Sequence, residues 1–214
     1  MILTNNVLQR ILCIRNGDSV GTAFTIDHVA RQYIVTARHV VDGIASGGAI
    51  SVRHEQRWAE VPITVVGLGD GDADVAVLAH AKPVTPSHPL SADGNFCIGQ
   101  AVAFPGFPFG WDAGAENMNH GFPFPFVKAG IVSAIVPGPR ERIYIDGHGN
   151  PGFSGAPLIV RQGNRLGTFT VAGVIADSPN DPITGEHAGF VGAVRIKCVL
   201  DLIDANPVGA PLLA

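Results

Sequence analysis

The chain has 214 residues, a formal net charge of -4 and only 15% charged residues. A chain of this length can form one large all-β domain or two small ones, and either can bury a sizeable core. The weak negative charge provides no basic stripe for phosphate groups, which argues against nucleic acid as a partner. No window approaches the roughly 18 consecutive apolar residues of a membrane span, so we expect no membrane association.

The N-terminus and the cysteines bear on the cellular compartment. Residues 1–15 lack a basic start and a small-residue cleavage site, so they do not predict a signal peptide. The three cysteines, Cys13, Cys97 and Cys198, have no C-x-x-C spacing, which argues against a disulfide framework or a zinc site. Free buried thiols suit a reducing compartment, so we expect a cytoplasmic protein without a metal or a cofactor.

Short apolar or β-branched runs, bounded by Gly, Asp and Asn, predict strands along most of the chain. The first set covers residues 21–26, 33–37, 50–54, 61–67 and 75–79. A proline-rich segment at 81–89 predicts an extended linker. The second set covers residues 100–104, 127–136, 142–145, 156–160, 168–176 and 189–194.

Only the end of the chain has helical spacing. Ile196, Val199, Leu200 and Ile203 follow the i, i+3, i+4, i+7 pattern, which predicts a closing helix over about 195–205. The predicted fold class is all-β, with two six-stranded antiparallel β-barrels and a short C-terminal helix. The N-terminal barrel would cover residues 1–85 and the C-terminal barrel residues 86–214. Within the second part, residues 104–126 predict a long loop whose phenylalanines we expect to pack rather than to form a ligand site, although an exposed cluster of them could grip an unfolded chain.

Ser154 lies in Asp146–Leu158, DGHGNPGFSGAPL, a turn dense in glycine and proline that opens into an apolar run. Gly152 and Gly155 flank the serine, and we expect a positive φ there because glycine tolerates a conformation that other residues resist. A lone serine between glycines is most often only a turn residue. Its interpretation as a nucleophile therefore depends on suitable partners elsewhere in the chain.

A serine hydroxyl needs a base to take its proton, and the base needs a third group to hold its tautomer. His39 follows an apolar run, and Asp74 stands directly before another. Asp72 competes for the role of the acid, but only Asp74 is followed at once by the predicted strand. Since His39 and Asp74 lie in the first barrel and Ser154 in the second, we expect a site in the cleft between the barrels.

Six segments in this order resemble the chymotrypsin-fold, trypsin-like serine proteases, and most of all the HtrA/Deg-type protease domain. They are residues 21–24 (GTAF), 36–41 (TARHVV), 74–78 (DVAVL), 104–110 with 129–133 (FPGFPFG and AGIVS), 150–158 (NPGFSGAPL) and 189–194 (GFVGAV) with the helix that follows. The resemblance covers most of the chain. It implies a chymotrypsin-like fold and a serine endopeptidase that acts on protein or peptide substrates.

The resemblance also implies roles for individual residues. Ser154 would be the acylating nucleophile, His39 the general base and then acid, and Asp74 the carboxylate that orients His39. The backbone N–H groups of Gly152 and Ser154 would form the oxyanion hole, where each donor contributes about 3 to 4 kcal/mol to transition-state stabilisation.

Substrate preference is predicted less sharply. By the same resemblance, the substrate-binding pocket would be lined by His148 and Gly149. The strands near residues 174–178, with Ala176, and residues 189–193, with Gly192, would complete the lining. No acid stands at His148, so a preference for Lys or Arg is not indicated. The histidine favours an acidic or polar substrate side chain, whereas the surrounding Gly and Ala favour a small or medium apolar one. We prefer the apolar alternative, which is usual for HtrA/Deg-type pockets.

Two departures from related families bear on control of activity. Trypsin-like digestive enzymes carry an Asp directly before the serine, whereas this chain has Phe153, so we expect no activation by N-terminal clipping. HtrA/Deg proteins usually carry a PDZ domain after the protease, and we expect none here. The oligomeric state stays open, since residues 1–15 could hold protomers together or form the first strand.

Three functions from different classes are compatible with these residues. The first is an active serine endopeptidase. The second is a catalytically silent module that binds peptides or unfolded chains. The third is a viral-type or toxin-like protease of narrow specificity, or an effector that stays inactive until a protein partner engages its loops. The complete set of His39, Asp74 and Ser154 favours the first and third. Whether the oxyanion turn is ordered or collapsed at rest cannot be predicted from sequence.

Overall fold

The computed structural model describes residues 3–86, 90–92, 95–114, 117, 119–138, 141–163 and 168–212. In chain order the first part comprises α1 (Asn5–Leu8), β1 (Ile11–Asn16), β2 (Ser19–His28), β3 (Arg31–Thr36), the 3-10 helix η1 (Arg38–Val41), β4 (Ala49–His54), β5 (Arg57–Pro62), β6 (Thr64–Leu68) and β7 (Ala76–Ala79). The second part comprises β8 (Ala101–Gly106), the 3-10 helix η2 (Pro108–Gly110), β9 (Phe126–Val136), β10 (Arg142–Asp146), β11 (Pro157–Arg161), β12 (Phe169–Asp177), β13 (Phe190–Arg195), α2 (Ile196–Ala205) and β14 (Ala210–Pro211).

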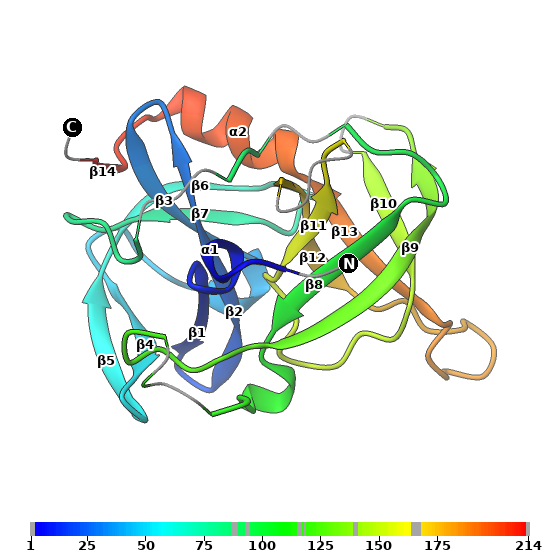
Figure 1. The fold of residues 1–214 in the computed structure, drawn as a ribbon, viewed down its shortest axis with the longest axis horizontal. Coiled ribbons are helices and arrows are strands. Elements are labelled where there is room, and N and C mark those ends of the chain that lie inside the picture. Colours follow the sequence, from blue (N-terminus) through cyan, green and yellow to red (C-terminus); the bar gives the residue numbers. More distant parts are fainter. Residues whose placement is uncertain are drawn as a thin grey trace.

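The strands form two sheets that lie side by side (Figure 1). The first is an eight-stranded sheet of the described residues, in the order β5-β4-β1-β2-β3-β7-β6, with β14 paired to β3. The second is a closed six-stranded barrel in the order β10-β13-β12-β11-β8-β9. Neighbouring strands in both sheets pair antiparallel. The predicted all-β class with a short C-terminal helix is therefore confirmed.

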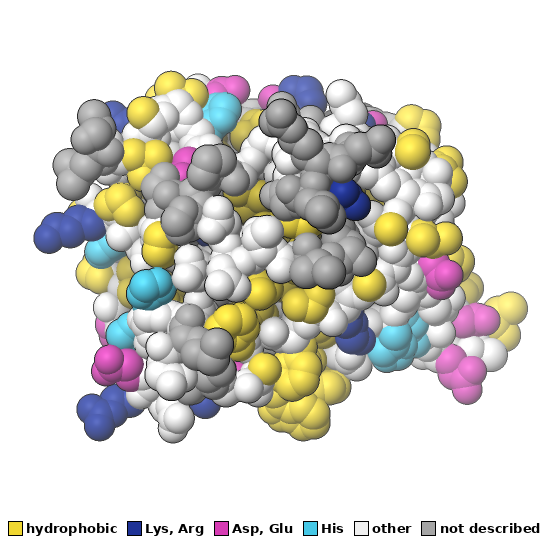
Figure 2. Space-filling model, in the orientation of Figure 1, with side chains coloured by type: hydrophobic (Ala, Val, Ile, Leu, Met, Phe, Trp, Pro, Cys, Tyr) yellow, Lys and Arg dark blue, Asp and Glu magenta, His cyan; other side chains and the backbone are white. Residues whose placement is uncertain are grey.

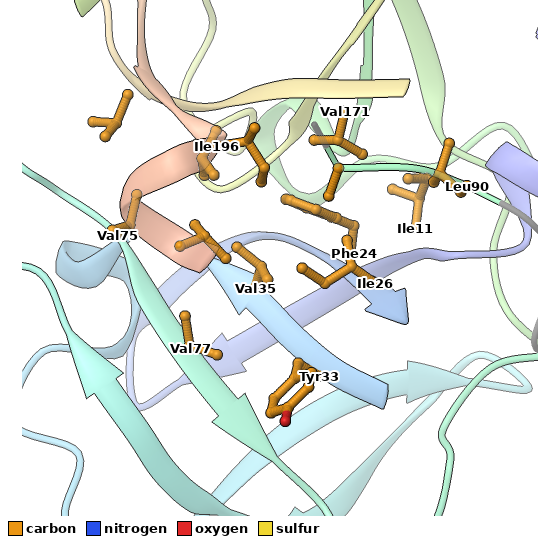
Figure 3. Close-up of a cluster of buried hydrophobic side chains, with 14 of the residues drawn as sticks. Ile11, Phe24, Ile26, Tyr33, Val35, Val75, Val77, Leu90, Val171 and Ile196 are labelled. Atoms are coloured by element: carbon orange, nitrogen blue, oxygen red, sulfur yellow. The ribbon is translucent and has the colours of Figure 1, made fainter. Parts of the chain in front are cut away.

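One hydrophobic cluster joins the two sheets. Figure 3 shows Phe24 and Val35 from the first sheet facing Val171 of β12 and Ile196 at the start of α2. All four side chains are almost completely buried. Since α2 presents its apolar face to this cluster, the helix closes the junction between the sheets, as its periodic sequence predicted.

The predicted linker is only partly covered by the structure. Residues 81–86 form neither strand nor helix, and residues 87–89 lie outside the described residues. The division into domains at residue 85 stays a prediction. Residues 1–15 do provide the first strand, β1, after the short helix α1. Within the described ranges, no helix is both long and apolar enough to cross a membrane.

Candidate active site

His39 and Asp74 lie next to each other at the ends of two paired strands inside the first sheet. His39 belongs to η1, directly after β3, and Asp74 lies in the turn before β7. The Asp74 carboxylate accepts two hydrogen bonds from His39. One comes from the backbone N–H at 2.9 Å and the other from ring atom Nδ1 at 2.5 Å. Asp72, the competing acid, instead offers its backbone carbonyl to Arg142. The geometry thus pairs His39 with Asp74.

This pairing shifts the pKa of both groups. The hydrogen bond to Asp74 raises the pKa of His39 above its usual value, and burial opposes that shift. For Asp74, burial favours a higher pKa, but the hydrogen bonds from the side chain and backbone of His39 outweigh it, and the pKa falls below its usual value. An Asp74 carboxylate that is ionised near neutral pH holds the proton of His39 on Nδ1, which leaves Nε2 free to accept a proton.

Ser154 lies in the loop between β10 and β11, and its two flanking glycines have the predicted conformations. Gly152 has φ +96 and Gly155 has φ +86. A Cβ at Gly152 would lie 2.2 Å from the Phe107 carbonyl oxygen, and one at Gly155 would lie 2.1 Å from that of Thr22. Glycine is therefore required at both positions by the backbone conformation and by the lack of space.

The serine turn of the barrel packs against the residues that flank His39 in the first sheet. A Cβ at Gly155 would lie 2.8 Å from the Ala37 backbone nitrogen. A Cβ at Gly21 would lie 2.7 Å from a methyl group of Val40 and 3.1 Å from the Ser154 carbonyl oxygen. The two sheets thus bring Ser154 and His39 to the same place, although no hydrogen bond joins their side chains among the described residues.

The backbone just before Ser154 forms a type II turn. Phe153 N–H donates to the Asn150 carbonyl at 3.1 Å, Pro151 fixes the first central φ and Gly152 provides the positive second one. The Pro151 carbonyl accepts a bond from Phe109 N–H at 2.7 Å. Because N–H and C=O of a trans peptide point in opposite directions, the Gly152 N–H points away from Phe109.

The N–H groups of Gly152 and Ser154 are two donors without an acceptor in the described part of the chain. Backbone donors inside a protein are nearly always paired, so two such N–H groups at a buried glycine and a half-buried serine are unusual. An anion or a developing oxyanion placed between them would satisfy both.

Phe153 anchors the turn from inside the barrel. Its side chain is fully buried, and its ring contacts Phe104 edge to face, with a centroid distance of 5.5 Å. Lys128 lies over the same ring and also donates to the carbonyl of His148 and to the side chain of Asn150. Position 153, where zymogen-activated proteases carry an Asp, is therefore occupied here by a phenylalanine of the hydrophobic core.

A pocket of about 290 Å³ opens beside Ser154. Its lining residues are Gly149, Asn150, Pro151, Phe153, Ser154, Ile175, Asp177 and Ser178. The pocket is narrow, since a Cβ at Gly149 would lie 1.9 Å from Ser178 Oγ and 3.4 Å from a methyl group of Val191.

Of the four residues predicted to bind substrate, the structure brings only Gly149 into this lining. His148 is exposed, and its ring contacts that of His187 in a tilted arrangement at a centroid distance of 4.0 Å. Ala176 is buried, and Gly192 faces the side chains of Asp177 and Arg142. The lining also takes Ile175, Asp177 and Ser178 from the predicted segment 174–178, although none of the three was singled out in advance.

The long loop between β8 and β9 also borders the site. Phe104 and Phe107 are buried, as the packing interpretation expected, whereas Phe109 and Trp111 are 55% and 64% exposed and their rings lie 5.3 Å apart. In Figure 2 hydrophobic side chains gather over this part of the surface. The described residues hold no group of three or more His, Cys, Asp or Glu side chains arranged to bind a metal ion.

Comparison with known proteins identifies the family. Residues 21–167 match the family described as "Trypsin-like peptidase domain", which is more than half of the chain. The chain belongs to the trypsin-like peptidase family. Its fold is that of an HtrA-type protease, AlgW, solved with a tripeptide (TM-score 0.65, 23% identity, 94% of this chain and 60% of that one). It is also that of Rv3671c from M. tuberculosis H37Rv in an inactive form (TM-score 0.63, 21% identity, 94% and 88%).

Curated relatives that are named DegP-like are similar to most of this chain. A "probable periplasmic serine endoprotease DegP-like" of Pseudomonas fulva is 30% identical over 198 residues, 89% of this chain and 35% of the relative. One of the same name from Halomonas elongata is 30% identical over 194 residues, 87% of this chain and 35% of the relative. The chain thus spans about a third of the length of these relatives. The predicted resemblance is confirmed.

The predicted location is corrected by the same relatives. They are named periplasmic, whereas the pattern of residues 1–15 and the thiols had led us to expect a cytoplasmic protein. The cysteines were weak evidence for a compartment. Cys13 is buried, which raises the pKa of its thiol to about 12, but Cys97 is exposed. The burial of these thiols therefore does not indicate a particular cellular compartment.

Proposed function

We propose that this trypsin-like peptidase is an endopeptidase that hydrolyses peptide bonds through an acyl-enzyme on Ser154. The observation that supports this proposal most is the pair of hydrogen bonds from His39 to Asp74, beside the turn that carries Ser154. The two N–H groups without acceptors at Gly152 and Ser154 are what an acyl-transfer site requires on its opposite side.

In the proposed reaction, Ser154 Oγ attacks the carbonyl carbon of the scissile peptide while His39 Nε2 takes the hydroxyl proton. The oxyanion that forms accepts hydrogen bonds from the N–H groups of Gly152 and Ser154. Collapse of this intermediate breaks the C–N bond, and His39 gives its proton to the leaving amine. Water then attacks the ester with His39 as base, which releases the acid and returns the proton to Ser154.

Asp74 keeps the His39 proton on Nδ1 throughout and stabilises the imidazolium that forms in each step. The hydrogen bond missing between His39 and Ser154 does not oppose the proposal. Such bonds are often long in the absence of substrate and tighten in the complex.

For the substrate we propose proteins or peptides with a small or medium apolar residue before the scissile bond. The support for this is the pocket beside Ser154, where Gly149 and Ser178 approach each other so closely that they leave no room for another carbon between them. We also propose an extracytoplasmic location, on the names of the relatives. Fractionation of cells that express the complete protein tests the location, and recovery with the cytoplasmic marker would exclude it.

A fluorophosphonate probe tests the proposed function, because it forms a bond only with an activated serine. The wild-type chain should label with one equivalent, and Ser154→Ala should abolish the label. Ser133→Ala, on β9 and away from the site, should label as the wild type does. A folded wild-type chain that neither labels nor cleaves a peptide library would exclude the endopeptidase and favour the silent peptide-binding module.

A further inference from the structure

Thr22 lies in β2 of the first sheet, yet its polar groups bind the serine turn of the barrel. Its side chain is completely buried. The Thr22 N–H donates to the Ser154 carbonyl at 2.9 Å, and its hydroxyl donates to the Gly152 carbonyl at 2.7 Å. One residue of the opposite sheet therefore holds two carbonyls of the turn.

The direction of the hydroxyl bonds follows from chemistry. The Phe107 N–H can only donate, so Thr22 Oγ1 accepts that bond, at 3.1 Å. The single hydroxyl proton is then directed to Gly152, whose carbonyl can only accept. A buried hydroxyl with its donor and its acceptor capacity both used has one orientation, so it connects Phe107 and Gly152 through fixed bonds.

Phe107 in turn begins the segment that orients the peptide between Pro151 and Gly152. Two residues later, Phe109 N–H donates to the Pro151 carbonyl, and Phe109 has φ 54, a left-handed conformation that is costly for a residue other than glycine. Backbone of this kind persists only where its surroundings determine it. Thr22 thus acts on both peptides of Gly152, directly on one and through residues 107–109 on the other.

Thr22 also contacts the histidine segment. Thr36 Oγ1 donates to the Thr22 carbonyl at 2.7 Å, and Thr36 ends β3 just before His39. The same buried residue therefore lies between the segment that carries the base and the turn that carries the nucleophile.

We propose that Thr22 is a positioning residue that keeps the N–H groups of Gly152 and Ser154 aimed at the oxyanion. The proposal rests on the proposed function above. Thr22 is buried and does not line the pocket, so its effect falls on turnover and not on the binding of substrate.

Thr22→Val tests this proposal, because valine keeps the shape of the side chain and removes only the hydroxyl. Loss of one oxyanion donor lowers kcat roughly 10²- to 10³-fold, and a donor that is present but loosely held should cost about 10- to 100-fold. KM should stay within about 3-fold. The inhibition constant of a peptide aldehyde, whose adduct carries the oxyanion, should rise by about the same factor as kcat falls, roughly 10- to 100-fold.

Two further variants separate positioning from general stability. Thr22→Ser keeps the hydroxyl and should restore kcat to within about 3-fold of the wild type. Thr25→Val is the matched control, since Thr25 lies on the same strand, is equally buried and bonds Thr85 away from the site. It should lower the Tm as much as Thr22→Val does, without the loss of kcat.

The outcomes are distinct. If the wild type labels with the probe and Thr22→Val keeps full kcat and aldehyde affinity, the positioning role is wrong and the proposed function stands. If the folded wild type neither labels nor cleaves a peptide library, both are wrong. Should Thr22→Val fail to fold, Thr22→Ala is measured with active-site titration, which counts only competent molecules, and unchanged turnover per competent site would overturn the role.

Discussion

His39 and Asp74 are joined twice, since the Asp74 carboxylate accepts from both the backbone N–H and the ring Nδ1 of His39. The backbone bond fixes the position of the carboxylate relative to the chain, and the ring bond fixes the imidazole relative to the carboxylate. The histidine therefore keeps its orientation although about half of its side chain is exposed to solvent.

The first prediction concerns Asp74→Asn. An amide can still occupy the same space, but it can donate to Nδ1 and so favours the tautomer with the proton on Nε2, which cannot act as base. In a triad of this kind the exchange lowers kcat roughly 10⁴-fold. The measurement is kcat for a peptide substrate, with Asp72→Asn as the control that should stay close to wild type. Equal losses in both variants would contradict the assignment of Asp74.

The second prediction is a pH profile with a defined sign. The base must be neutral, and Asp74 raises the pKa of His39, so kcat/KM should fall as pH drops through a midpoint above about 6.5. The contribution of this raised pKa to folding stability has the opposite trend. It is complete at low pH and is lost as pH rises through the folded-state pKa. A kcat/KM midpoint below the usual histidine value would show that Asp74 does not control His39.

The lowered pKa of Asp74 adds a second, separate dependence at acid pH. Its contribution to stability is present above the unfolded-state pKa and is lost as pH falls through the folded-state value. Urea unfolding of the wild type and Asp74→Asn between neutral and acid pH measures it. The difference in unfolding free energy between the two proteins should shrink toward the acid end.

The fold could be predicted from sequence where burial leaves a pattern, and not elsewhere. β9 and β12 are long apolar runs, and α2 has a helical stripe of apolar residues, so each was found within a residue or two. β5 was not predicted as a separate strand, because most of its side chains are exposed and show no pattern of apolar residues. Its pairing with β4 is a tertiary effect that no local signal reports.

The site, like the fold, could be predicted only in part from the sequence. His39, Asp74 and the positive φ of Gly152 and Gly155 were predictable, because each depends on residue type within a short motif. The role of Thr22 was not, because its bond to Gly152 joins residues 130 positions apart, in different sheets. The ring contact of His148 with His187 was also unpredictable, since it joins two loops 39 positions apart in the chain.

The third prediction tests the space behind the nucleophile. Gly155→Ala places a Cβ 2.1 Å from the Thr22 carbonyl oxygen and 2.3 Å from Thr36 Oγ1, at a φ of +86. The backbone conformation alone costs about 1 to 3 kcal/mol, and overpacking adds about 1 to 3. Urea unfolding should show this loss together with slower fluorophosphonate labelling.

Gly147→Ala is the control for that experiment. It lies in the same loop, its nearest atom would be a carbon of Phe104 at 3.9 Å, and its φ is not positive. It should leave stability within about 0.5 kcal/mol of the wild type. Equal stability of the Gly155 and Gly147 variants would contradict the close contact between the serine turn and β2.

The fourth prediction tests what limits the substrate side chain. Gly149→Ala puts a Cβ 1.9 Å from the present position of Ser178 Oγ, so the Ser178 hydroxyl has to rotate away. We expect the rotated hydroxyl to fill part of the pocket. One methylene in an apolar pocket changes kcat/KM by about 10- to 200-fold. Cleavage after Val or Leu should therefore fall at least about 10-fold more than cleavage after Ala, while probe labelling persists.

His148→Ala is the control and should not change the ratio of cleavage after Leu to cleavage after Ala, because the His148 ring lies outside the pocket lining. If instead His148→Ala removed a measurable cleavage after Asp or Glu and Gly149→Ala left the Leu to Ala ratio unchanged, the histidine and not the pocket depth would select the substrate.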